Sequence, residues 1–280
     1  MAGLLVATFA ASSPATAAAA PQAHAAHAPR AAVAPPDGGT VLYFTHDVDG
    51  KGATSYEVAN GSIATYWFGH AFELDGTQYF TGFSWDTRER YGKPGEDDVG
   101  PGTQVNLAEA TFILTDPSAE RPWKFRGMEH TIGEFGAYER ADEVDTTRKP
   151  LEHRTSSGKL VLAVPTESFD NGITVSGYAI FVFTPPEKRL DDAKDKVWAF
   201  LGSVLAGEDN SLACADGDVM PCTRSTGELV FSENGNGDMP LLTVKPSGTT
   251  ISGPDKTRQL GAADVAAYAY DAASKAYVVR

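Results

Sequence analysis

The sequence predicts an all-β protein: an antiparallel sandwich or barrel, with a smaller C-terminal β-unit and at most one or two short helices. Three observations predict this fold class. Short runs of alternating apolar and polar residues recur along the chain, clusters of Gly, Pro, Asn and Asp separate them, and one pair of runs is joined by a two-residue hairpin turn. Because 42% of the 280 residues are hydrophobic, the chain can fold around a substantial core rather than stay disordered.

The first residues carry the features of an export signal. Leu4–Ala11 is a short apolar run, and Ala-x-Ala sites follow at 15–17 and 23–25. We therefore expect a signal peptide over 1–25, a Pro/Ala linker over 26–40, and a secreted or periplasmic location. No basic residue precedes the apolar run, so the alternative is a low-complexity tail on a cytosolic protein. The run is too short to span a bilayer, which predicts that the protein is not inserted in a membrane.

The best-defined element is a hairpin over residues 63–86. Asp75-Gly76 is a typical type I′ turn between two alternating runs, and it fixes which residues face each other. One face is then an aromatic ladder, which should lie on the core because such cross-strand pairs stabilise a sheet. The pairs of this ladder include Phe72–Tyr79, Phe68–Phe83 and Tyr66–Trp85.

The second face of the hairpin carries the most concrete binding hypothesis. There Trp67 and Phe80 should flank Gly69 and Gly82, a directly opposed glycine pair that leaves a bare strip between two rings. A flat ligand such as a sugar ring could approach the backbone along this strip. The alternative is that another sheet packs on this face, with the glycines admitting its side chains.

Further strands complete a main β domain expected over 41–186. A strand should begin at Val41, and 173–184 is apolar on both faces, which is typical of a central strand. Residues 87–106 form a long polar loop, and 127–153 is charged without clear periodicity. The other strands expected in this domain are Leu107–Thr115, Trp123–Arg126 and Lys159–Val164.

A C-terminal β-unit is expected over 187–280. Residues 188–205 fit a helix or a strand, and short strands should follow near 228–232, 240–245, 266–270 and 276–279. The two cysteines, Cys214 and Cys222, flank a short loop with a Gly and a Pro, which predicts one disulfide in an oxidising compartment.

Charge and motifs exclude several classes of function. A formal charge of −14 with no basic stripe predicts that the protein does not bind nucleic acid. No Gly-rich phosphate loop is present, and Ser84 lacks the flanking glycines of a nucleophile elbow. The histidines after the leader are not spaced as metal ligands, so we expect no transition-metal site.

Two kinds of site chemistry stay open. The segment from His46 to Gly52 begins like an EF-hand loop, but Lys51 stands where a ligand is required, so calcium is the one cofactor that the acidic turns leave open. Paired carboxylates could cleave a glycosidic bond, with Glu129, Glu134 and Glu139 as nominees.

From these observations we expect a secreted or periplasmic, envelope-associated protein that binds without catalysis. Its partner should be a glycan or an extracellular or periplasmic protein, met through the aromatic hairpin face or the 87–106 loop. The alternatives are an extracytoplasmic carbohydrate-active hydrolase that uses paired carboxylates, and a structural surface protein. Two carboxylates that converge in a pocket would favour the hydrolase.

Overall fold

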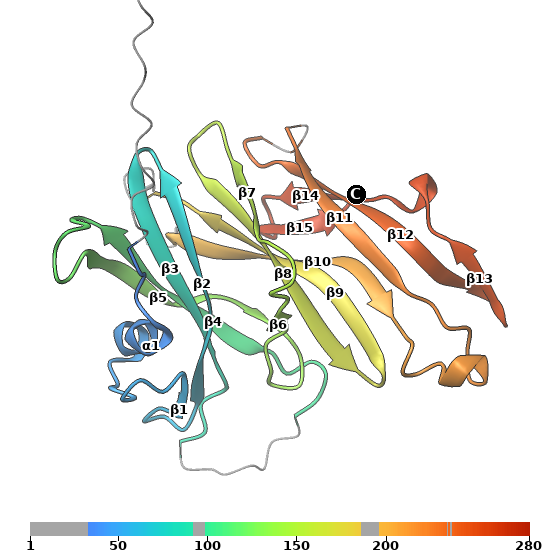
Figure 1. Cartoon of the computed structure of the whole chain (residues 1–280), viewed down its shortest axis with the longest axis horizontal. Coiled ribbons are helices and arrows are strands. Elements are labelled where there is room, and N and C mark those ends of the chain that lie inside the picture. The colour runs from blue at the N-terminus through green and yellow to red at the C-terminus, as the bar shows by residue number, and fades with distance from the viewer. Residues whose placement is uncertain (1–32, 92–98, 186–195, 234, 236) are drawn as a thin grey trace, which may run out of the picture. The chain divides into compact units, whose positions relative to one another are not determined.

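A computed structural model describes residues 33–91, 99–185, 196–233, 235 and 237–280 (Figure 1). The predicted signal peptide over 1–25 lies outside the described residues, as do 26–32 of the predicted linker and parts of 87–106 and 188–205. The described strands pair antiparallel and form three five-stranded sheets, with one α-helix among the described residues. The all-β prediction is confirmed. No described helix has the length and apolarity that a bilayer crossing requires.

The first sheet, called the outer sheet, is an antiparallel meander in which each strand pairs with the next along the chain. Its strands are β1 (Ser55–Glu57), β2 (Ile63–Leu74), β3 (Thr77–Asp86), β4 (Val105–Leu114) and β5 (Trp123–Phe135). The β2–β3 hairpin turns at Asp75-Gly76, both with positive φ, and its register follows the prediction from Leu74–Thr77 to Phe68–Phe83.

Beyond Phe68 the predicted register is wrong. A β-bulge at Trp67 shifts the pairing by one, so Tyr66 faces Ser84 and Thr65 faces Trp85. The bulge turns the Trp67 ring onto the same core as Phe68, where it contacts Phe135 edge-on. An extra residue in one strand re-aims side chains in this way, and alternation alone does not reveal it.

The middle sheet lies between two hydrophobic cores (Figure 1). Its strands are β6 (Glu143–Val144), β7 (Leu151–Arg154), β8 (Leu160–Asp170), β9 (Ile173–Phe183) and β10 (Trp198–Asp209). In β9, Phe181 and Phe183 pack toward the outer sheet, whereas Tyr178 and Ile180 pack toward the C-terminal sheet. The prediction that this segment is a central strand is confirmed.

The C-terminal sheet covers the second face of the middle sheet. Its strands are β11 (Ser225–Ser232), β12 (Leu241–Gly253), β13 (Lys256–Gln259), β14 (Ala266–Asp271) and β15 (Ala276–Val279). The segment left open between helix and strand is a strand from Trp198 onward, and this strand, β10, pairs with β9. Backbone hydrogen bonds therefore cross the predicted division between 186 and 187.

The strand expected at Val41 is instead the helix α1 (Gly38–His46). Asp37 caps its first turn by accepting a hydrogen bond from the Thr40 backbone at 2.8 Å. The helix buries Val41, Leu42 and Thr45 and packs on the face of the outer sheet that points away from the middle sheet. This tertiary packing decides the structure of a segment whose residue types favour a strand.

Candidate functional site

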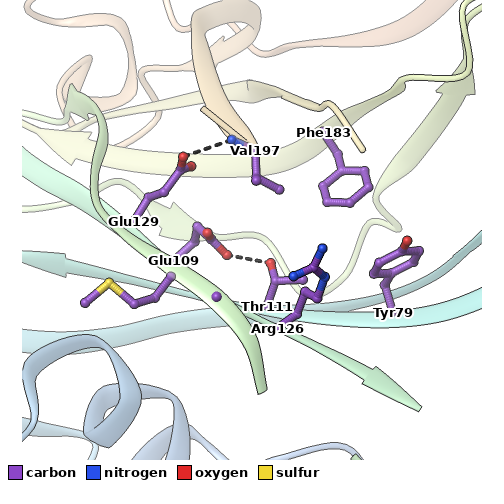
Figure 2. A pocket seen from close by; sticks show the side chains of 9 residues that line it. Tyr79, Glu109, Thr111, Arg126, Glu129, Phe183 and Val197 are labelled. Atoms are coloured by element: carbon purple, nitrogen blue, oxygen red, sulfur yellow. Dashed lines mark hydrogen bonds between the residues drawn. The ribbon is translucent and has the colours of Figure 1, made fainter. Parts of the chain in front are cut away.

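Two glutamates meet in a small pocket between the outer and middle sheets, which we call the Glu109 pocket (Figure 2). Glu109 of β4 and Glu129 of β5 are direct cross-strand partners. The pocket has a volume of about 160 Å³. Its remaining lining residues are Tyr79, Thr111, Arg126, Gly127, Met128, Phe183 and Val197.

Glu109 is almost fully buried, with 1% of its surface exposed. Burial raises its pKa well above the ordinary value, and the neighbouring charge of Glu129 raises it further, against the hydrogen bond from Thr111. The shift favours the protonated, uncharged form of the carboxyl group. Thr111 Oγ1 donates to Glu109 Oε2 at 2.5 Å, and no other described residue bonds the carboxyl.

A chain of hydrogen bonds leads from Trp198 to the Glu109 carboxyl group. Trp198 Nε1 donates to Thr81 Oγ1 at 3.1 Å, and Thr81 Oγ1 lies 2.8 Å from Thr111 Oγ1. Each hydroxyl has a single hydrogen, and that of Thr111 is used on Glu109, so Thr81 donates to Thr111. Oε2 of Glu109 is thus held by Thr111, and Oε1 is the carboxyl oxygen that no described residue bonds.

Glu129 is held from the other side of the pocket. Its Oε1 accepts from the Val197 backbone at 2.9 Å and its Oε2 from the Trp198 backbone at 3.1 Å. The register of β5 against β4 shifts on both sides of Glu129, and Arg126 is the extra residue of one irregularity. Bulges at a sheet edge commonly re-aim side chains next to functional sites. Here one places the Arg126 side chain in the wall of the pocket (Figure 2).

A much larger site, called the acidic groove, lies where the end of β8 meets the segment between β5 and β6. It encloses about 870 Å³ and carries two exposed rings, Tyr138 at 41% and Phe169 at 62% exposure. Its charged lining residues are Arg140, Asp142, Glu143, Glu167 and Asp170. Glu143 and Glu167 are direct cross-strand partners, a like-charge pairing that costs stability and therefore suggests a role other than folding.

Asp142 is the least solvated acid of the groove. Burial raises the pKa of its carboxyl, and no described residue pairs with that carboxyl. Its backbone carbonyl accepts a hydrogen bond from Trp67 Nε1 at 2.9 Å, which fixes the backbone at this point. A half-buried carboxylate without a partner, facing an open groove, is typical of a group reserved for a ligand.

The strip predicted as a binding platform is covered. Phe80 is only 4% exposed, and Val41 of α1 occupies the space over the glycine pair. A Cβ added to Gly82 would lie 2.2 Å from Val41 Cγ2, and one added to Gly69 would lie 2.5 Å from Phe80 Cζ. The expectation that Trp67 shares a face with Phe80 is wrong, because the bulge turns Trp67 to the opposite core.

The carboxylate nominees are separated in space. Glu129 lines the Glu109 pocket, whereas Glu139 is buried in an ion pair with Arg90 and accepts from the Arg88 backbone at 3.1 Å. Glu134 faces Asn106 across the strands and lies in neither site. Glu109 was missed, although its position between Leu107 and Thr111 on the inward face of an apolar strand is a signal that could have found it.

The EF-hand-like segment runs from the end of α1 into a turn. Asp49 Oδ1 accepts from the Lys51 backbone at 2.8 Å. His46 lines a different pocket with His130, and the two ring centroids lie 6.5 Å apart. Burial and the neighbouring His130 lower the pKa of His46 to about 4. Within the described ranges, no group of three or more His, Cys, Asp or Glu side chains could hold a metal ion. Calcium binding by this segment stays a prediction.

Cys214 and Cys222 form the predicted disulfide, with their Cα atoms 5.2 Å apart. They close the loop between β10 and β11. Asn210 ties the same loop, because its side chain donates to the Pro221 carbonyl at 3.0 Å and accepts from the Thr223 backbone at 2.7 Å. The sequence matches no family model, and the chain matches neither a curated protein nor a solved structure.

Proposed function

We propose that this chain is an extracytoplasmic, non-catalytic glycan-binding protein whose ligand lies in the acidic groove. The observation that carries the proposal is the combination, in one groove, of the exposed rings of Tyr138 and Phe169 with the Asp142 carboxylate, which pairs with no residue in the described ranges. The disulfide supports a location in an oxidising compartment.

The chemistry of the groove fits a neutral sugar better than an anion. Aromatic side chains offer large, flat apolar surfaces against which the apolar face of a sugar ring can stack. Carboxylates are strong hydrogen-bond acceptors, and sugar hydroxyls supply the donors that they need. Since Arg140 is the one cation beside four carboxylates among the described lining residues, an anionic ligand would be repelled. The groove volume of about 870 Å³ lies within the usual range of ligand sites.

A second candidate, cleavage of a glycosidic bond in the same groove, is favoured by one observation. The pKa of Asp142 is raised by burial, as a general acid requires, and Glu143 and Glu167 stand nearby as ionisable partners. The Glu109 pocket is a poorer place for this reaction. At about 160 Å³ it is smaller than ordinary ligand pockets, and both Glu129 oxygens already bond backbone N–H groups.

A thermal-shift screen of the full chain against neutral oligosaccharides and soluble cell-wall fragments tests the proposal. A ligand at a hundred times its Kd should stabilise the protein by about 2.7 kcal/mol. Phe169→Ala should abolish the shift. Tyr91→Ala, which removes a ring that is 71% exposed outside the groove, should preserve it.

The results of this screen distinguish glycan binding from glycan cleavage and from binding of a protein partner. A saccharide that shifts the wild-type protein and the Tyr91 variant but not the Phe169 variant supports the proposal. Chromatography of the bound saccharide then distinguishes binding from cleavage, because a hydrolase would shorten it. Absence of a shift with every saccharide, or an unchanged shift in Phe169→Ala, would overturn the proposal. Binding of a basic peptide instead would point to a protein partner.

A further inference from the structure

We propose that the Glu109 pocket is a second binding site, independent of the acidic groove, and that it takes a short-chain carboxylate. Three features of the pocket carry this inference. They are its size, the carboxyl oxygen of Glu109 that Thr111 leaves unbonded, and the Arg126 guanidinium, which has no acidic partner among the residues that the structure describes.

The size of the pocket limits the ligand to a few atoms. An engineered protein cavity of about 150 Å³ admits benzene, which has six carbon atoms. The Glu109 pocket has a similar volume of about 160 Å³. Gly127 contributes to this space, because a Cβ added to it would meet no atom within 4 Å. A carboxylate with four carbons, such as butyrate, has six non-hydrogen atoms and matches this size.

The buried acid offers a donor rather than a negative charge. Glu109 Oε2 accepts from Thr111, so Oε1 is the carboxyl oxygen left for a ligand. The raised pKa of the group favours the form in which it carries a proton and can donate. No described residue bonds Oε1. Oε1 is not one of the buried atoms that lack a hydrogen-bond partner. We infer that it borders the pocket, where the oxygen of a ligand would form this hydrogen bond.

The charges that line the pocket favour an anion. The Glu129 carboxylate is already compensated by the backbone N–H groups of Val197 and Trp198. The Arg126 guanidinium lines the pocket and, in the described part of the chain, has no acidic partner. Guanidinium groups bind carboxylates through two parallel hydrogen bonds. A small carboxylate would thus contact Arg126 through its charged group and accept a hydrogen bond from Glu109.

Titration calorimetry on the full chain with three probes of similar size tests the inference. Sodium butyrate should bind. Butyramide has the same number of non-hydrogen atoms without the charge and should bind at least ~10-fold more weakly, because hydrogen bonds with two ionised partners are the stronger ones. n-Butylammonium, which carries the opposite charge, should not bind. Sodium chloride keeps the ionic strength constant, so that non-specific screening is the same in every titration.

Variants locate the site. Arg126→Gln should weaken butyrate binding at least ~10-fold, because it removes the charged partner. Lys124→Gln removes a nearby cation of the same strand that does not line the pocket, and should leave the Kd unchanged. Gly127→Val should narrow the cavity and abolish binding, since the Cβ position at this residue is open space. Thermal unfolding of each variant shows whether it is folded, so that a lost calorimetric signal can be assigned to lost binding.

The inference is overturned if butyrate fails to bind the wild-type protein, or if butylammonium binds more tightly than butyrate. It is also overturned if Arg126→Gln and Lys124→Gln weaken butyrate binding equally, since general attraction of the anion to surface charge would then explain the binding without a specific site. If Gly127→Val folds and still binds butyrate with an unchanged Kd, the ligand lies elsewhere and the assignment to this pocket fails.

Discussion

The indole nitrogen of Trp67 donates a hydrogen bond to the backbone carbonyl of Asp142, 75 residues away, at 2.9 Å. The bond joins the bulge of β2 to the wall of the acidic groove. Trp67 is therefore a positioning residue: it holds the backbone that carries the Asp142 carboxylate, while its ring packs in the core.

Trp67→Phe should keep most of the core packing but lose this bond. We expect a loss of about 1 kcal/mol in the free energy of unfolding, as for a typical hydrogen bond, and weaker binding of any groove ligand. Trp85→Phe is the control. Trp85 also packs on this core, and no hydrogen bond of its indole nitrogen is found among the described residues. Urea unfolding with ligand titration measures both effects. Equal effects of the two variants on groove binding would contradict the positioning role.

Gly82→Ala should destabilise the protein through a clash with α1. The added Cβ would lie 2.2 Å from Val41 Cγ2, so the helix must shift. Overpacking of this kind costs about 1–3 kcal/mol. Adding Val41→Ala should recover part of the loss, because the two sites are coupled. Gly253→Ala in β12 meets no atom within 4 Å and should change stability little. A mild effect of Gly82→Ala alone would mean that α1 does not pack tightly on this strip.

Glu109 should make the protein less stable as the pH rises. Its pKa is raised in the folded protein above the ordinary 4.5, so above that pH the unfolded chain loses a proton that the folded protein keeps. The free energy of unfolding then falls with pH, by at most about 1.4 kcal/mol per pH unit, until the raised pKa is reached. Below pH 4.5 the carboxyl is protonated in both states and contributes no slope.

Glu109→Gln should remove this slope, whereas Glu134→Gln, an exposed change on β5, should keep it. Urea unfolding between pH 4 and 8 measures the difference. Butyrate binding should instead weaken at higher pH, above the raised pKa, where the folded protein itself loses the Glu109 proton. Arg126, Glu129 and Tyr79 are the other titratable groups that line the pocket. A wild-type slope that survives in Glu109→Gln would assign it to another group.

Reduction of the Cys214–Cys222 disulfide should destabilise the protein without unfolding it. The bridge spans a sequence separation of 8. The chain-entropy model gives about 2–3 kcal/mol for so short a loop. Asn210 still ties the loop after reduction, so the loss should fall below this figure. Asn210→Ala should make the reduced protein markedly less stable than the oxidised variant, as thermal unfolding with and without reductant would show. If reduction lowers the stability of the wild type and of Asn210→Ala equally, the disulfide and the Asn210 hydrogen bonds do not act together on this loop.

The sequence predicts those parts of the fold that depend on local chemistry. The turn at Asp75-Gly76 fixes seven residue pairs of the β2–β3 hairpin, and the apolar run of β9 identifies a strand that is buried on both faces. The bulge at Trp67 could not be predicted in this way, because its indole bonds Asp142 from a distant segment. The helix α1 was missed because the run Val41–Phe44 consists of residue types that favour a strand, and only the glycine strip on the sheet makes room for the helix.

The candidate sites were less accessible to prediction. Glu129 was a nominee, but its partner Glu109 becomes visible only when β4 and β5 are placed side by side. Tyr138 and Phe169 come from segments about thirty residues apart in a charged region and a strand end, and nothing local indicates that they share a groove.

Because both faces of β9 are buried in the folded protein, this strand is exposed while the chain is still incompletely folded. Its segment Tyr178–Phe183 contains no charge, no proline and no glycine, the composition of segments that stack into amyloid-like fibrils. Half of its side chains are covered by residues that come later in the chain. During synthesis this face of β9 therefore stays uncovered until the C-terminal sheet has been made and has folded. A chain that ends before β11 would leave the face exposed and able to self-associate.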